Sequence, residues 1–208
     1  MQSFEKLNKR NAKAFFDAYL ARKDGVLAEM MRQYAADGHD PRELDYSPQS
    51  LVPFWVWMRV KMTSPSWDVQ DAPNEQMPMW YLPLHVNDEH RPRPISKQSA
   101  ELADMFAYYW GEVLRRNIPD LHWGIGDHPG SYGYCAPMVL GEYYSAIPLP
   151  AGQLAVYNAN RPSEPKYAED NYLNSFKNAV EDEAKYRALY NKLGGHDDPR
   201  MAKRVKFD

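Results

Sequence analysis

The sequence has a single cysteine, Cys135, and it lacks long hydrophobic runs and an excess of basic residues. A single cysteine excludes an intramolecular disulfide and fits a reducing compartment. The first twenty residues contain no apolar segment of the kind found in a secretory signal. Apolar runs such as Phe54–Met58 are far shorter than the roughly 18–20 residues that cross a bilayer. We therefore expect a cytoplasmic protein that has no membrane partner.

The charge balance argues against a dedicated nucleic-acid binder. Lysine and arginine total 25 residues against 28 aspartates and glutamates, and the formal net charge is −3. Binding to a phosphate backbone needs an extended basic face, and the sequence contains none. The one basic cluster lies in residues 196–208, which we interpret as a flexible basic tail. Residues 1–195 are long enough for a single globular domain.

Sequence motifs for catalysis and for metal binding are also missing. There is no Gly-x-Ser-x-Gly elbow and no phosphate-binding loop, and Cys135 lies in an apolar context typical of a buried, inert thiol. Two groups of His and Asp residues lack the spacing that marks zinc sites: His122, Asp127 and His128, and His85, Asp88 and His90. We therefore predict no catalytic set, no metal and no cofactor.

Aromatic residues, in contrast, are abundant, with 6 tryptophans and 15 tyrosines. Their side chains bury large areas, and they are also enriched at interfaces because one end is apolar and the other is polar. We interpret the excess first as an aromatic-rich core and second as an interaction surface.

Hydrophobic spacing predicts helices in the N-terminal third of the chain. The pair Ser47-Pro48 is typical of a helix start, although residues 48–62 also alternate as a strand would; we favour the helix. A proline-rich connection then precedes the central helix. The predicted segments are helices at 3–22, 25–36 and 48–62, and a connection at 64–95 with one short strand at 80–86.

The second half of the chain predicts a small antiparallel sheet and a long C-terminal helix, so the fold class is α+β. A central amphipathic helix begins at Ser96 or Ser99 and ends before Pro119. The glycine-rich stretch 124–133 is interpreted as a hairpin connection. The segments that follow the central helix are strands at 121–125, 134–144 and 153–157, and a helix at 167–193.

The central helix carries one apolar stripe, and we expect its opposite face to be solvated. Glu112 precedes Arg116 by four residues, the orientation that favours an ion pair, which we expect to be exposed. Gly111 inside the helix indicates that another segment crosses the backbone there. The predicted stripe is Leu102, Met105, Phe106, Tyr109, Val113 and Leu114, and the predicted solvated face is Glu101, Asp104, Tyr108, Glu112 and Arg115.

Two strings resemble the recurrent motifs of an uncharacterised family of soluble bacterial proteins. They are Leu44–Trp55 (LDYSPQSLVPFW), and Ala107–Asn117 (AYYWGEVLRRN) followed by Trp123. The resemblance spans about residues 1–160 and implies a compact domain, without an activity, cofactor or catalytic residue to carry over. Small bacterial α+β proteins with an acidic helical face also resemble, in general character, the immunity proteins that bind and block toxins.

These observations favour a cytosolic binding or interaction protein with a protein partner, and they leave its oligomeric state open. The alternative is a small hydrolase-like enzyme that uses a carboxylate pair, Glu112 and Glu142, in a pocket beside the 124–133 loop. The candidate binding residues lie near the end of the central helix and in the segment after it: Tyr108, Glu112, Arg115, Arg116, Trp123 and His128.

Overall fold

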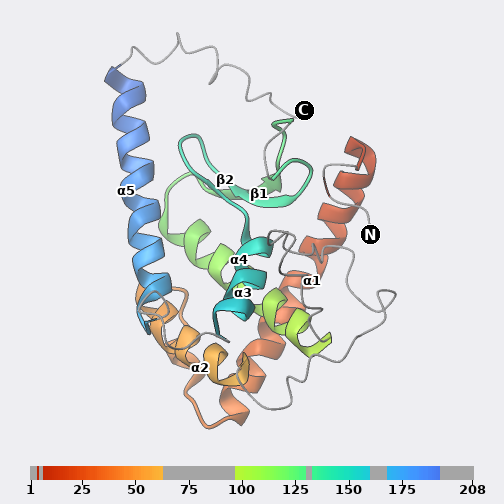
Figure 1. Ribbon diagram of the computed structural model, residues 1–208, viewed down its shortest axis with the longest axis vertical. Coiled ribbons are helices and arrows are strands. Elements are labelled where there is room, and N and C mark those ends of the chain that lie inside the picture. The colour runs from red at the N-terminus through yellow and green to blue at the C-terminus, as the bar shows by residue number, and fades with distance from the viewer. Residues whose placement is uncertain (1–3, 5–6, 63–96, 130–132, 160–167, 193–208) are drawn as a thin grey trace, which may run out of the picture.

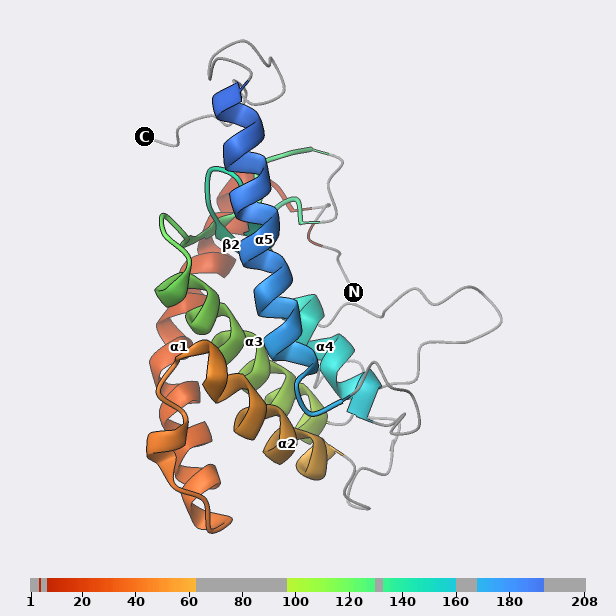
Figure 2. The same ribbon diagram turned by 90° about the vertical axis from the view of Figure 1, so that its left-hand side faces the viewer.

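The computed structural model describes residue 4 and residues 7–62, 97–129, 133–159 and 168–192, and it confirms the α+β class. Helix α3 runs through the middle of the molecule, the sheet lies near one end, and α5 lines the outside (Figures 1 and 2). The helices are α1 (Lys9–Ala36), α2 (Leu51–Met62), α3 (Lys97–Asn117), α4 (Pro148–Ala159) and α5 (Asn171–Lys192); the 3-10 turns are η2 (Pro41–Glu43) and η3 (Pro48–Ser50); the strands are β1 (His122–Ile125), β2 (Pro137–Leu140) and β3 (Ser145–Ala146).

Helix α1 is one continuous helix, so the prediction of two helices with a break near Gly25 is wrong. Its N-terminus is capped by Asn8, whose side chain accepts a hydrogen bond of 2.8 Å from the backbone of Asn11. Tyr19, before the glycine, and Met30, after it, are both buried in the same core. Because a helix interior tolerates one glycine at a cost of about 1 kcal/mol, packing on both sides holds the helix together.

Residues 48–62 form a helix, as predicted. Ser47 caps the 3-10 turn η3, which leads directly into α2. Phe54, Trp55 and Met58 on α2 are fully buried, and Phe54 stacks on Phe106 of α3 with ring centroids 5.6 Å apart. The abundant aromatic residues therefore build the core where α2 meets α3.

The sheet has three antiparallel strands in the order β1-β2-β3. Strands β1 and β2 form a hairpin in which Trp123 pairs with Val139, which confirms the hairpin prediction for the glycine-rich stretch. Residues 153–157, predicted as a strand, belong instead to α4. Pro148 occupies the first position of α4, where proline favours a helix start, and this preference outweighs the short apolar run that suggested a strand.

Helix α4 crosses α3 at very short range. Gly152 on α4 lies so close to Ala103 on α3 that an added Cβ would overlap the Ala103 carbonyl oxygen. The crossing therefore requires a residue without a side chain at position 152.

Helix α5 confirms the predicted long C-terminal helix. Its residues Tyr172, Phe176 and Ala179 are buried, and α5 packs mainly on α2. None of the helices in the described ranges combines the length and the hydropathy that a membrane span requires. The predicted connection at 64–95, its strand at 80–86 and the tail at 196–208 lie outside the described residues.

We predict opposite effects for alanine at two helical glycines. Gly152→Ala should lower the free energy of unfolding by about 1–3 kcal/mol, because the new methyl group has to displace backbone of α3. Gly25→Ala is the matched control and should raise it by about 0.5–1 kcal/mol, since nothing beyond the adjoining backbone of α1 lies within 4 Å of the new Cβ. Urea denaturation measures both, and equal effects at the two sites would contradict the close crossing.

Candidate binding surface around Glu112

The face of α3 that was predicted to be solvated is mostly buried, so that prediction is wrong. Asp104, Tyr108 and Glu112 are all buried, whereas Glu101 is exposed and Arg115 is half-buried. The physical reason is that α1 packs across this face and provides a polar partner for each buried group.

Three polar contacts join α1 to α3. Tyr108 donates a hydrogen bond of 2.7 Å to the Tyr19 carbonyl oxygen. Arg22 Nη2 lies 2.8 Å from Asp104 Oδ2, and Lys23 Nζ lies 3.1 Å from Glu112 Oε1. Arg22 and Lys23 are neighbours on α1, whereas their partners lie eight residues apart on α3. The two helices therefore cross at an angle, as Figure 2 shows.

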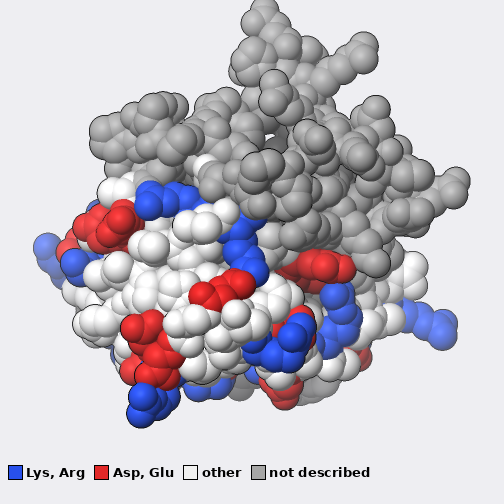
Figure 3. All heavy atoms as spheres, turned by 90° about the horizontal axis from the view of Figure 1, so that it is seen from below, with Lys and Arg blue, Asp and Glu red and all other residues white. Residues whose placement is uncertain are grey.

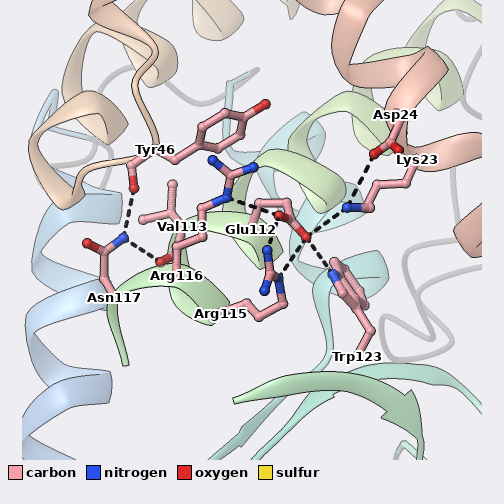
Figure 4. Close-up of polar contacts among 9 residues, drawn as sticks. All are labelled: Lys23, Asp24, Tyr46, Glu112, Val113, Arg115, Arg116, Asn117 and Trp123. Atoms are coloured by element: carbon pink, nitrogen blue, oxygen red, sulfur yellow. Dashed lines mark hydrogen bonds and ion pairs between the residues drawn. The ribbon is translucent and has the colours of Figure 1, made fainter. Parts of the chain in front are cut away.

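Glu112 is the centre of the largest polar cluster around α3 (Figure 4). Its Oε1 accepts hydrogen bonds from Trp123 Nε1 at 2.8 Å, Lys23 Nζ at 3.1 Å and Arg115 Nε at 3.1 Å. Its Oε2 accepts from Arg115 Nη2 at 2.8 Å and from Arg116 Nε at 3.2 Å. Both oxygens are therefore fully used, and the donors come from α1, α3 and β1.

The predicted ion pair between Glu112 and Arg116 is confirmed, but the expectation that it is exposed is wrong, because the Glu112 side chain is 0% exposed. Gly111 lies at a crossing point, as predicted. A Cβ at this position would lie 2.5 Å from the Trp123 ring, so the glycine lets that ring lie against α3 and its Nε1 reach Glu112.

The donors also determine the charge of Glu112. Burial alone raises the pKa of Glu112, but the hydrogen bonds from Arg115, Trp123 and Lys23 outweigh burial and lower the pKa to about 2. Glu112 is therefore ionised at neutral pH, and it attracts the three cations that surround it.

Tyr46 extends this cluster to the surface. The guanidinium carbon of Arg116 lies 3.7 Å from the centre of the Tyr46 ring. Asn117 Nδ2 donates to the Tyr46 carbonyl oxygen at 2.7 Å and to the Val113 carbonyl oxygen at 2.8 Å. These bonds fasten the segment before η3 to the end of α3.

The outer parts of the cations face solvent. The exposed fractions of the side chains are 20% for Lys23, 36% for Arg115 and 44% for Arg116. We call Lys23, Arg115, Arg116 and Tyr46 the cationic surface. Lys23 Nζ also lies 3.3 Å from Asp24 Oδ1, and the Asp24 side chain is 91% exposed, so one carboxylate borders this surface.

The six sequence-predicted site residues thus fall into two groups. Glu112, Arg115, Arg116 and Trp123 are brought together. Tyr108 is buried in the α1–α3 crossing, and His128 is exposed in the connection between β1 and β2.

Sequence reasoning missed Lys23 and Tyr46. Lys23 is 89 residues from Glu112 in the chain, so no local spacing connects them. Tyr46 lies in the string Leu44–Trp55 and Arg116 in the string Ala107–Asn117, so the structure brings these two strings together in space. Their membership in these two strings is the one sequence feature that connects Tyr46 with Arg116.

Asp104 differs from Glu112 although both are buried on α3. Among the described residues, its side chain accepts a hydrogen bond from Arg22 alone, through Oδ2, and its Oδ1 accepts none. Burial raises the pKa of Asp104 to about 6, because the attraction to Arg22 offsets only part of the loss of solvation.

Other candidate groups have simpler surroundings. Within the described ranges no cluster of three or more His, Cys, Asp or Glu residues could hold a metal ion, and His85, Asp88 and His90 lie outside those ranges. Burial raises the pKa of the Cys135 thiol, which fits an inert thiol. Glu142 is exposed, in contrast to the buried Glu112.

Comparison with protein-family models, with curated proteins and with solved structures found no match. The resemblance of the two strings to a bacterial family therefore stays a prediction.

The raised pKa of Asp104 predicts a pH-dependent stability. The folded protein holds this proton more tightly than the unfolded chain, whose ordinary pKa is 3.8. The resulting stabilisation is fully present below about pH 3.8 and is lost as the pH rises through about 6. The free energy of unfolding should thus increase by about 1–1.5 kcal/mol from pH 7.5 to pH 5, because about one pH unit of this window lies below the folded pKa. Glu112 should contribute no slope there, because its stabilisation is lost only below about pH 4.5.

The control for this measurement is Asp104→Asn, which keeps the shape of the side chain and cannot titrate. Urea denaturation of both proteins across this pH range should show the increase only in the wild type. An equal increase in Asp104→Asn would assign the pH dependence to another group.

We also predict that Glu112→Ala lowers the free energy of unfolding by about 2–4 kcal/mol, because it leaves three cations crowded together and the Trp123 N–H without its acceptor. Glu29→Ala is the matched control, since Glu29 binds Arg32 on the surface of α1. That variant should change stability little. Equal losses in the two variants would show that the Glu112 cluster behaves as an ordinary surface ion pair.

Proposed function

We propose that the protein is a binding protein and that the cationic surface is where it contacts a protein partner. The observation that carries this proposal is the position of Glu112. A fully buried carboxylate holds Arg115 and Arg116 from beneath, while the outer parts of both side chains stay in solvent. Arginine and tyrosine are the residue types that most often dominate binding energy at protein interfaces.

The number of cations around Glu112 supports a role beyond stability. One bidentate arginine satisfies a buried carboxylate, and Arg115 already provides that contact. Lys23 and Arg116 add two more positive charges, whose mutual repulsion opposes folding. A surface that is held rigid before binding loses less side-chain entropy when a partner arrives, so the arrangement favours recognition.

The alternative, an enzyme with Glu112 as its acid or base, is less consistent with the geometry. A general acid must carry a proton near neutral pH, whereas the pKa of Glu112 is lowered to about 2. Both oxygens are also occupied by donors from the protein itself. The acidic helical face that prompted the likeness to immunity proteins is packed against α1, so we propose no toxin as the partner.

We predict that the double variant Arg115→Gln/Arg116→Gln loses a specific partner. Cross-linking in extracts of the cells that express the protein, followed by mass spectrometry, should find at least one protein bound to the wild type and absent from the variant. Arg32→Gln/Arg42→Gln is the matched control, because both arginines lie in exposed, short-range ion pairs with Glu29 and Asp40. This control should retain the partner.

Circular dichroism must show that both double variants are folded at the capture temperature. Capture of the same proteins by all three chains would contradict the proposed surface. A hydrolytic activity that is present in the wild type and lost in a folded Glu112→Gln variant would favour the enzyme instead.

A further inference from the structure

The arginines of the cationic surface keep unused hydrogen-bond donors. Arg116 contacts Glu112 through Nε, and its guanidinium carbon lies over the Tyr46 ring; neither of its Nη groups makes a hydrogen bond to the described residues. Arg115 contacts Glu112 through Nε and Nη2, and its Nη1 group likewise makes no hydrogen bond to the described residues. Each Nη group carries two N–H donors, and these side chains are partly exposed.

The local charge is positive in an acidic protein. Lys23, Arg115 and Arg116 carry three positive charges, and Glu112 and Asp24 carry two negative charges, which leaves a net charge of +1. The whole chain has a formal net charge of −3. Because Glu112 has no exposed surface, a partner touches, of these charged groups, only the cations and Asp24, and it experiences the net charge of +1.

We infer that the cationic surface recognises carboxylate groups of an acidic protein segment. This inference rests on the proposed function and adds the chemistry of the partner. The planar guanidinium fork matches the two oxygens of a carboxylate, and charge-assisted hydrogen bonds of this kind are about twice as strong as neutral ones. The contact with the Tyr46 ring, 3.7 Å from the guanidinium carbon to the ring centre, holds the Arg116 group in place beside the ligand position.

The charge distribution favours a short acidic segment over a nucleic acid. A polyanion needs an extended basic stripe that follows its backbone. On the face shown in Figure 3, acidic and basic side chains are intermixed, and no large area carries one sign. A compact group of two arginines and a lysine fits one or two carboxylates.

Titration with a synthetic octaglutamate peptide at low ionic strength tests the inference. Isothermal titration calorimetry measures the affinity directly, because the six tryptophans of the chain make fluorescence unspecific for this site. Arg116→Gln should weaken binding by about tenfold or more, the effect of losing charge-assisted hydrogen bonds. Asp24→Asn should strengthen binding, because it removes the one exposed carboxylate of the site. Added salt should weaken binding in all variants.

The controls separate charge from other forms of attraction. Octaglutamine and octalysine should not bind, and Arg32→Gln should bind octaglutamate as the wild type does, since Arg32 lies in a separate ion pair. Inorganic phosphate at equal ionic strength should compete weakly through the same arginines. Binding of octaglutamine as strong as that of octaglutamate would overturn the inference, and so would an unchanged affinity in both Arg116→Gln and Asp24→Asn.

The cross-linking result distinguishes this failure from failure of the proposed function. If the arginine double variant loses a partner but octaglutamate does not bind, the proposal that the cationic surface binds a partner stands, and the inference that the partner is acidic is wrong. If the double variant loses no partner and octaglutamate does not bind, both proposals fail.

Discussion

The structure depends on an ionised carboxylate, Glu112, at a position with no solvent exposure. Removing an unpaired carboxylate from water costs several kcal/mol, so the fold has to provide donors around it. They come from α1, from the last turn of α3 and from β1, three regions that are separate in the chain. Satisfying this one group therefore fixes how α1 crosses α3 and where the sheet begins. Gly111 makes the same geometry possible, because it lets the Trp123 ring lie against the helix.

Asp104 shows that burial alone does not determine the state of a carboxylate. Both acids lie on the same side of α3 and both face α1. Within the described part of the chain, Glu112 has four donor side chains and a pKa lowered to about 2, whereas Asp104 has Arg22 alone and a pKa raised to about 6. The difference follows from the number of hydrogen bonds to each carboxylate. Near neutral pH, Glu112 therefore stabilises its surroundings, whereas Asp104 acts against folding.

Features set by neighbouring residues were predictable from the sequence, and features set by distant contacts were not. The helix at 48–62 follows from its Ser-Pro start, and the β1–β2 hairpin follows from its glycines. The burial of Asp104 and Glu112 depends on α1, whose Arg22 and Lys23 lie 82 and 89 residues before their partners, so periodicity alone predicted a solvated face. Sequence reasoning found Glu112, Arg115, Arg116 and Trp123 because they lie within one short stretch, and it missed Lys23 and Tyr46 because they do not.

The same carboxylate links stability to recognition. Isolated arginines on a surface are flexible, and a partner that binds them must order each side chain at a cost of about 0.5–1.5 kcal/mol. Here that ordering has already occurred during folding, through Glu112 from beneath and Tyr46 from the side. The outer N–H groups are thus held in position without being used. It follows that loss of Glu112 weakens both folding and binding. Loss of Asp24, at the edge of the cationic surface, changes only the charge of that surface.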